Sequence, residues 1–187
     1  MTETELKNYI AAIRPADRDA MAAARQRQAQ LAKPPGSLGA LEDMSVRLAG
    51  VTGRVCPPMN RCRVAVFAAD NGVVDEGVSC APRSVTVQQA INMTRRKTGM
   101  SAMAAAFGDD VAVVDVGMDC GTTPAGILNR RVRRSTGDIA IEDAMTRPQA
   151  LAAMAAGMEQ AALARADGVT ALGIGEMGIG NTSTSDR

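Results

Sequence analysis

A stretch near the end of the sequence combines several glycines with one acidic side chain. It reads GIGEMGIGNTSTS over residues 173–185, and its first six letters match the G-x-G-x-x-G pattern of dinucleotide-binding loops. The glycines leave the backbone bare, so its N–H groups can approach an anion. Glu176 lies among them, where a carboxylate would repel a bound pyrophosphate but would suit a ribose or a positively charged ring.

Three interpretations of this stretch are open on these residues alone. A dinucleotide site needs a helix after the loop and an acid about twenty positions further on. The sequence runs only nine residues past Gly178. The glycines could instead form only a tight turn from strand to helix, with Asn181 or Thr182 as the helix N-cap. A bare backbone beside one fixed acid favours the third interpretation, a site for a ribose or a cationic ring.

Two further polar stretches are candidates for ligand binding. Residues 69–94, ADNGVVDEGVSCAPRSVTVQQAINMT, are either a long surface loop leading into a helix or a binding loop. Residues 129–138, NRRVRRSTGD, place four arginines in five positions, which fits a solvated strand or a phosphate patch. Nucleic acid is not indicated, because no broader basic face accompanies these arginines.

The overall composition excludes several kinds of function. The 187 residues have a net charge of +1, so no global field draws the chain to nucleic acid or to an acidic membrane. The sequence contains no histidine and its four cysteines form no C-x-x-C pair, so neither a zinc site nor a Ser-His pair is indicated. Any proton transfer must then be done by carboxylates. An acidic N-terminus and the absence of a long apolar run predict a cytoplasmic protein.

The elements that must position these residues alternate between strand and helix. Three short apolar runs closed by turn signals predict buried strands, and helix-compatible segments separate them. We therefore expect an α/β fold, a Rossmann-like parallel sheet flanked by helices. Ligands bind at the carboxyl edge of such sheets, which makes Asp70, Asp115 and Gly175 residues of interest. The expected strands are 63–72, 110–117 and 168–175, and the expected helical segments are 85–107 and 147–166.

The first part of the sequence is helical. Its amphipathic, alanine-rich stretches are about 3–13, 16–32 and 38–49, and KPPGSLG interrupts them at 33–39. A C-P-P sequence at 56–58 marks a linker, because consecutive prolines end helices and favour extended chain. We therefore expect two domains, residues 1–55 as a helical segment of a small domain and residues 56–187 as an α/β nucleotide-binding core.

Five motifs occur in order along the chain: KPPGSLGALE (33–42), VFAADNGVVDEGVS followed by AP, VT, QQ and NM (66–93), VVDVGMD (113–119), STGDIA (135–140) and GIGEMGIGNTSTS (173–185). Together they resemble the motifs of nicotinate-nucleotide:dimethylbenzimidazole phosphoribosyltransferases, the enzymes of cobalamin lower-ligand assembly. The similarity extends from about residue 16 to residue 185, nearly the whole chain.

The resemblance implies a chemical reaction and an assembly. Such a transferase moves the phosphoribosyl group of nicotinate mononucleotide onto a ring nitrogen of 5,6-dimethylbenzimidazole, and it releases nicotinate and α-ribazole 5′-phosphate. It implies a homodimer when the protein is complete, with no metal, no cofactor, and no nucleic-acid or membrane partner.

Site residues are implied by position. Glu176, as the catalytic residue, lies with Gly175, Gly178 and Asn181 in the nicotinate mononucleotide site. A carboxylate there could stabilise positive charge developing at C1′ and accept the N–H proton of the incoming base. The benzimidazole pocket contains Pro82 and Gln89, together with Ala81, whose position can be serine in relatives.

Two departures from the family pattern affect these expectations. Asn71 stands where relatives often have histidine, so the role of this side chain is open. The family's principal catalytic glutamate belongs to a C-terminal half that these 187 residues do not contain. We therefore expect this chain alone to be inactive or nearly so, and unstable through an uncovered sheet edge. The alternatives are a non-catalytic half that binds base or nucleotide and needs a partner subunit, and an NAD-linked dehydrogenase.

Overall fold

The structure is a computed structural model that describes residues 1–185. Its chain divides into two compact units: residues 6–59, here called the helical unit, and residues 1–5 together with the chain from residue 60 onward, here called the α/β unit. The domain boundary expected between residues 55 and 56 stays a prediction. Within residues 1–185, no helix is both long enough and apolar enough to span a membrane.

Two helices of the helical unit pack through small side chains. They are α2 (Arg18–Ala29) and α3 (Ala40–Thr52), and Ala24, Val46 and Ala49 form their buried core. Asp17 caps α2, because its carboxylate accepts two backbone N–H groups of the first turn. The N-terminal helix α1 (Glu3–Ala11) begins in the α/β unit and continues into the helical unit.

The KPPGSLG segment of the helical unit is closed by an ion pair. Lys33 Nζ lies 2.6 Å from Glu42 Oε1, and the same oxygen accepts the backbone N–H of Leu38 at 3.2 Å. The hydrogen bond from the Lys33 ammonium is the largest cause that lowers the pKa of the Glu42 carboxyl, and the hydrogen bond from the Leu38 backbone N–H lowers it further. The lysine and the glutamate at the two ends of the motif therefore fix the loop between them.

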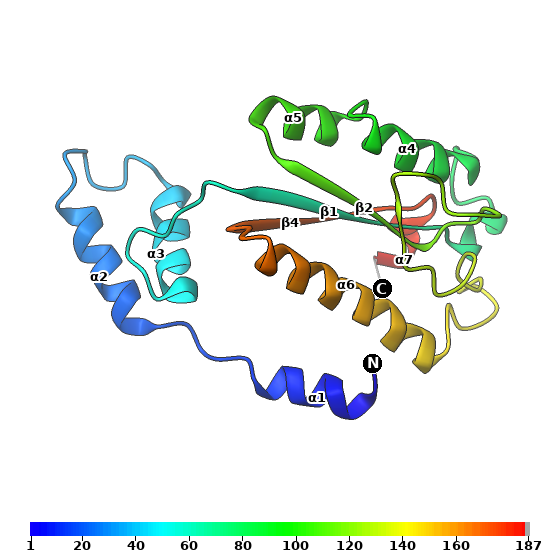
Figure 1. Cartoon of the computed structure of the whole chain (residues 1–187), viewed down its shortest axis with the longest axis horizontal. Helices are drawn as coiled ribbons and strands as arrows, with labels where there is room; N and C mark the ends of the chain where they lie inside the picture. The colour runs from blue at the N-terminus through cyan, green and yellow to red at the C-terminus, as the bar shows by residue number, and fades with distance from the viewer. Residues whose placement is uncertain (186–187) are drawn as a thin grey trace. The chain divides into compact units, whose positions relative to one another are not determined.

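The α/β unit contains a four-stranded parallel sheet with the strand order β3-β2-β1-β4. Figure 1 shows α4 (Ser84–Thr94) and α5 (Gly99–Phe107) on one face of this sheet and α6 (Arg147–Ala166) on the other. The expected α/β fold, a parallel sheet flanked by helices, is confirmed. The strands are β1 (Cys62–Ala69), β2 (Asp110–Gly117), β3 (Leu128–Asn129) and β4 (Ala171–Met177).

Alternate residues of β1 face the two helical layers. Ala68 belongs to a buried cluster with Ala90 of α4 and with Val113 and Met118. Phe67 faces α6, where a Cβ atom added to Gly157 would lie 4.0 Å from the phenylalanine ring. Successive side chains of the strands therefore point alternately toward α4 and toward α6.

Several element boundaries differ from those expected. Residues 85–107 form two helices, because Arg96 adopts a left-handed φ of 60° and Thr98 with Ser101 forms a capping box that begins α5. The strand expected over 168–175 begins only at Ala171, after Gly168 with a φ of 73° ends the turn from α6. The strand β1 ends at Ala69, and the two-residue strand β3 is not among the expected strands.

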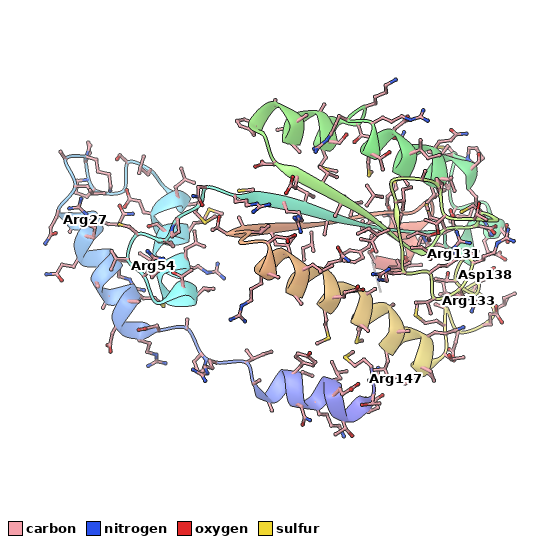
Figure 2. All side chains as sticks on the ribbon, viewed as in Figure 1. Arg27, Arg54, Arg131, Arg133, Asp138 and Arg147 are labelled. Carbon is pink, nitrogen blue, oxygen red and sulfur yellow. The ribbon has the colours of Figure 1, made fainter. Side chains whose placement is uncertain are left out.

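Three of the four arginines in residues 130–134 are paired with acids of the same unit. Figure 2 shows Arg131 and Arg133 at the end of the sheet where the strands finish. Since the paired cations are already balanced, the segment favours a structural role over a phosphate patch. The pairs are Arg130–Glu159, Arg131–Asp115 and Arg134–Asp119, with N–O distances of 2.5, 2.7 and 2.8 Å.

The Arg131–Asp115 pair predicts a large loss of stability when it is broken. The side chain of Asp115 is fully buried and that of Arg131 is 15% exposed. Removing the carboxylate therefore leaves the Arg131 guanidinium without its ion-pair partner and poorly hydrated. We expect Asp115→Ala to lower the free energy of unfolding by about 3–5 kcal/mol, measured by urea denaturation. Glu159→Ala, at an exposed pair that water screens, should lower it far less, and equal losses would contradict this prediction.

The Lys33–Glu42 pair predicts a pH dependence. Because the folded-state pKa of Glu42 is lowered, its carboxylate stabilises the fold above the unfolded-state pKa, and this contribution is lost as the pH falls through the folded value. In Lys33→Met the principal hydrogen bond is absent, so the pKa of Glu42 should rise toward its ordinary value. A carbon-13 NMR titration of the glutamate carboxyls measures this, and an unchanged Glu42 titration would contradict it.

Candidate functional site

The turn that follows β1 joins the segments expected at the site. It consists of Asp70, Asn71 and Gly72, here called the β1 turn, and the short 3-10 helix η1 (Gly72–Glu76) continues from it. The turn lies at the carboxyl edge of the sheet, where the parallel strands β2 and β4 also end (Figure 1). This is the edge at which parallel α/β sheets bind ligands.

Gly178 brings the backbone that follows β4 against the end of β1. A Cβ atom at this position would lie 2.1 Å from the carbonyl oxygen of Ala69 and 3.0 Å from Asn71 Nδ2. No side chain fits there, so this glycine is required by the contact between two backbones. Gly180 has a φ of 86°, and a Cβ atom on it would lie 2.7 Å from Val74 Cγ2.

Ile179, between these two glycines, is bonded to two other elements through its peptide groups. Its N–H donates to Thr86 Oγ1 in α4 at 3.1 Å, and its carbonyl oxygen accepts from Asn71 Nδ2 at 3.1 Å. Thr184 Oγ1 donates to the other end of the Asn71 amide at 3.4 Å. Thr86 is fully buried. The loop after β4 is therefore fixed by hydrogen bonds as well as by steric contact.

Glu176 lies in a strand, which corrects the sequence-based placement of this residue inside a glycine-rich loop. It is the penultimate residue of β4, and its backbone pairs with Phe67 of β1. Its side chain is exposed, and Oε1 accepts a hydrogen bond from Asn181 Nδ2 at 2.5 Å. Asn181 begins the short helix α7 (Asn181–Ser185), so two of the residues expected in the nucleotide site are bonded directly.

The first two glycines of the G-x-G-x-x-G match also lie within β4. A Cβ atom on Gly173 or Gly175 would make only ordinary contacts, at 3.5 Å to Val64 and 3.6 Å to Val66 respectively. Gly175 therefore faces away from Glu176, which shares the face of Phe67. Because these glycines do not form the turn between strand and helix, the geometry does not match a dinucleotide loop.

The segment STGD (135–138) contacts the same β1 turn. The N–H of Gly72 donates to Thr136 Oγ1 at 3.0 Å, and the N–H of Thr136 donates to the Asp70 carbonyl oxygen at 3.0 Å. A Cβ atom on Gly72 would lie 2.6 Å from the carbonyl carbon of Gly137. Three motifs that are far apart in the sequence thus meet at the β1 turn.

Of the acids expected at the carboxyl edge, Asp70 and Asp115 are buried within the fold. Asp70 is 1% exposed, and its Oδ2 accepts the backbone N–H of Asp119 at 2.7 Å. Its Oδ1 has no hydrogen-bond partner among residues 1–185. Asp115 binds Arg131, as described above. Among Asp70, Asp115 and Glu176, Glu176 is therefore the residue whose carboxylate a ligand can reach.

The residues expected to bind the acceptor base surround the beginning of α4. The N–H of Ala81 donates to Ser79 Oγ at 3.2 Å, and the carbonyl oxygen of Pro82 accepts from Val85 at 3.0 Å. Pro82 is exposed, whereas Ala81 and Gln89 are partly buried. Gln89 follows Thr86 by three residues, so the helix that bonds Ile179 also presents Gln89. Thr86 therefore connects this group to Ile179 in the loop after β4.

Two of the positioning contacts could not be singled out from the sequence. Thr86 and Thr136 bond to backbone groups that are 93 and 64 residues away, and no local pattern marks such partners. Asn71, whose role the sequence leaves open, bonds through both ends of its amide. In the part of the chain that the structure describes, no group of three or more His, Cys, Asp or Glu residues could hold a metal ion.

Comparison with known proteins shows the family to which this chain belongs. Residues 13–186 match the family model described as "Phosphoribosyltransferase". A nicotinate-nucleotide--dimethylbenzimidazole phosphoribosyltransferase of Geobacter sp. (strain M21) is 43% identical over 96% of this chain and 52% of its own length. One of Clostridium perfringens (strain 13 / Type A) is 40% identical over 96% of this chain and 50% of its own.

A solved structure agrees with these relatives. The nicotinate-nucleotide-dimethylbenzimidazole phosphoribosyltransferase of Thermus thermophilus superposes with a TM-score of 0.83 at 45% identity. The superposition covers 89% of this chain and 51% of that one. The present chain therefore spans about half the length of the relatives that it matches.

The contact at Gly178 predicts a substitution that displaces the loop. Gly178→Ala places a methyl group against the Ala69 carbonyl oxygen, and this oxygen cannot move without distorting β1. We expect the free energy of unfolding to fall by about 1–3 kcal/mol, measured by chemical denaturation. Gly173→Ala is the matched control, because its Cβ meets only ordinary contacts. A control variant as unstable as Gly178→Ala would refute the steric explanation.

Proposed function

Because the chain belongs to the phosphoribosyltransferase family, we propose that it binds nicotinate mononucleotide and 5,6-dimethylbenzimidazole for phosphoribosyl transfer between them. The products are nicotinate and α-ribazole 5′-phosphate. The observation on which this proposal depends is the Glu176–Asn181 pair, an exposed carboxylate fixed at the carboxyl edge beside a bare glycine backbone. A carboxylate in this position complements a cationic ring or a cationic transition state.

The reaction has modest chemical demands that fit a chain without histidine. The bond between C1′ and the pyridinium nitrogen breaks, and its electron pair neutralises the departing nicotinate ring. The lone pair of a benzimidazole nitrogen forms the new bond to C1′, and the proton on the other ring nitrogen is lost to a base. The protein must place the acceptor close to C1′, stabilise positive charge there and accept one proton.

Roles follow from the positions of the expected residues. Glu176 is the catalytic candidate, because its carboxylate is exposed and its orientation is set by Asn181. Gly175, Gly178 and Asn181 are assigned to the nucleotide side by the resemblance, and Gly178 holds the loop there through its contact with the Ala69 backbone. The acceptor side consists of Ala81, Pro82 and Gln89 at the beginning of α4.

Full turnover requires more than these residues. By the resemblance, the principal catalytic glutamate lies in a C-terminal half, and this chain spans about half the length of its relatives. We therefore propose that these 187 residues bind both substrates but transfer the phosphoribosyl group poorly, and that the complete assembly is a homodimer. The alternative is a non-catalytic half that binds base or nucleotide and acts with a partner subunit.

Turnover tests whether these residues are part of a transferase. Liquid chromatography of the 187-residue chain with both substrates should show little α-ribazole 5′-phosphate. Addition of a C-terminal half taken from a relative should raise the rate if the chain is a transferase. A rate comparable to that of a full-length relative without any addition would contradict the requirement for further residues.

Binding tests the role of Glu176 directly. We expect Glu176→Gln to weaken nicotinate mononucleotide binding about fivefold in calorimetry, the effect of losing one exposed charge pair. Glu159→Gln, which changes an acid paired with Arg130, should leave the affinity unchanged. Unchanged affinity in Glu176→Gln, or tighter binding of NAD than of the mononucleotide, would count against the proposed function.

A further inference from the structure

Arg83 directly follows Pro82, and its side chain extends to the β1 turn. Its Nη2 donates to the Gly72 carbonyl oxygen at 3.1 Å and lies 2.7 Å from Asp75 Oδ2. Its Nη1 lies 3.7 Å from Asp119 Oδ2. The side chain is 25% exposed, and Nε is buried with no hydrogen-bond partner among residues 1–185. One guanidinium therefore spans the beginning of α4 and the loops that follow β1 and β2.

These contacts differ in what they constrain. The Asp75 side chain is 75% exposed, so water screens this ion pair and it stabilises the fold little. The bond to the Gly72 carbonyl oxygen is charge-assisted, and Gly72 is itself immobilised against Gly137. Asp119 is also fixed, because its backbone N–H bonds to Asp70. Arg83 therefore binds to parts of the site that other contacts also hold in place.

The β1 turn connects Arg83 to the loop after β4 through hydrogen bonds. Gly72 is adjacent to Asn71, and Asn71 bonds the Ile179 carbonyl oxygen while Thr86 of α4 bonds its N–H. Thr86 follows Arg83 by three residues, and the carbonyl oxygen of Arg83 accepts the Thr86 N–H at 2.9 Å. The first turn of α4, the β1 turn and Ile179 thus form a closed ring of contacts that includes Arg83.

We propose that Arg83 is a positioning residue that couples acceptor binding at the beginning of α4 to nucleotide binding beside Glu176. The proposal rests on the proposed function, which assigns those two sides. Arg83 acts through its contacts with Gly72 and Asp119. A guanidinium suits this role because its planar donors reach the carbonyl oxygen and the carboxylate together, which a lysine ammonium cannot do equally well.

The test measures coupling between the two ligands in the full 187-residue chain. The acceptor probe is 5,6-dimethylindole, whose ring nitrogen has no free lone pair, so no transfer occurs. Its dissociation constant is measured with and without saturating nicotinate mononucleotide. We expect the nucleotide to tighten binding about tenfold in the unsubstituted chain, a typical coupling between sites. In Arg83→Met this factor should fall close to one while nucleotide affinity alone stays within about twofold.

Two further variants separate positioning from general stability. Arg83→Lys should recover part of the coupling because it restores the charge and one donor. Arg134→Met, which removes the other arginine that pairs with Asp119, should retain the full coupling. A lower melting temperature in Arg83→Met with undiminished coupling would show a merely structural role and overturn the proposal.

Hydrogen exchange distinguishes failure of this inference from failure of the proposed function. If the unsubstituted chain binds neither ligand, the proposed function fails, and amide exchange in the ligand-free chain then decides the role of Arg83. We expect the amides of Gly72 and Ile179 to exchange about tenfold faster in Arg83→Met than in Arg134→Met, because local opening becomes easier. Equal exchange in the two variants would overturn the positioning role.

Discussion

The backbone contact between Ala69 and Gly178 is the constraint on which the arrangement of the site depends. The parallel register of β1 and β4 ends at Ala68 and Met177, and the chains beyond must either separate or touch. They touch, which only a glycine allows. Ile179 then lies between Thr86 and Asn71, and Asn181 reaches back to Glu176. These contacts follow one another along the chain directly after Gly178.

Charge at this edge of the sheet is distributed unevenly. Asp115 is used by Arg131, and Asp70 is enclosed by the loops that follow β2 and the arginine segment. Burial of these acids leaves the carboxylate of Glu176 exposed to a ligand. The arginines that resemble a phosphate patch in the sequence serve to fix the loops around the site. An edge with several charged residues can therefore present a ligand with one exposed carboxylate.

The sequence predicts those features that have a local signal. Apolar runs of strand length predict the parallel sheet. The density of glycines suggests room for an anion, whereas at Gly178 the missing side chain makes room for the Ala69 backbone. The break between α4 and α5 was missed, because the capping box of Thr98 with Ser101 lies within an otherwise helical pattern. The expected strand over 168–175 stops one residue before Glu176, so the sequence places Glu176 in a loop, whereas β4 continues to Met177. The Thr86–Ile179 bond joins residues 93 apart, and no periodicity reports such a contact.

The position of Glu176 within β4 has a consequence for how such a protein can change over time. Its Cα is set by hydrogen-bonded register against β1, whereas Ala81 and Pro82 lie in a loop outside the sheet. Substitutions in that loop can alter the shape offered to an incoming base without displacing the carboxylate. In the proposed function, substitutions at Ala81 and Pro82 can therefore change the preferred acceptor while Glu176, beside the departing nicotinate ring, stays in place. The strand thus fixes the position of the carboxylate, whereas the loop can change in sequence.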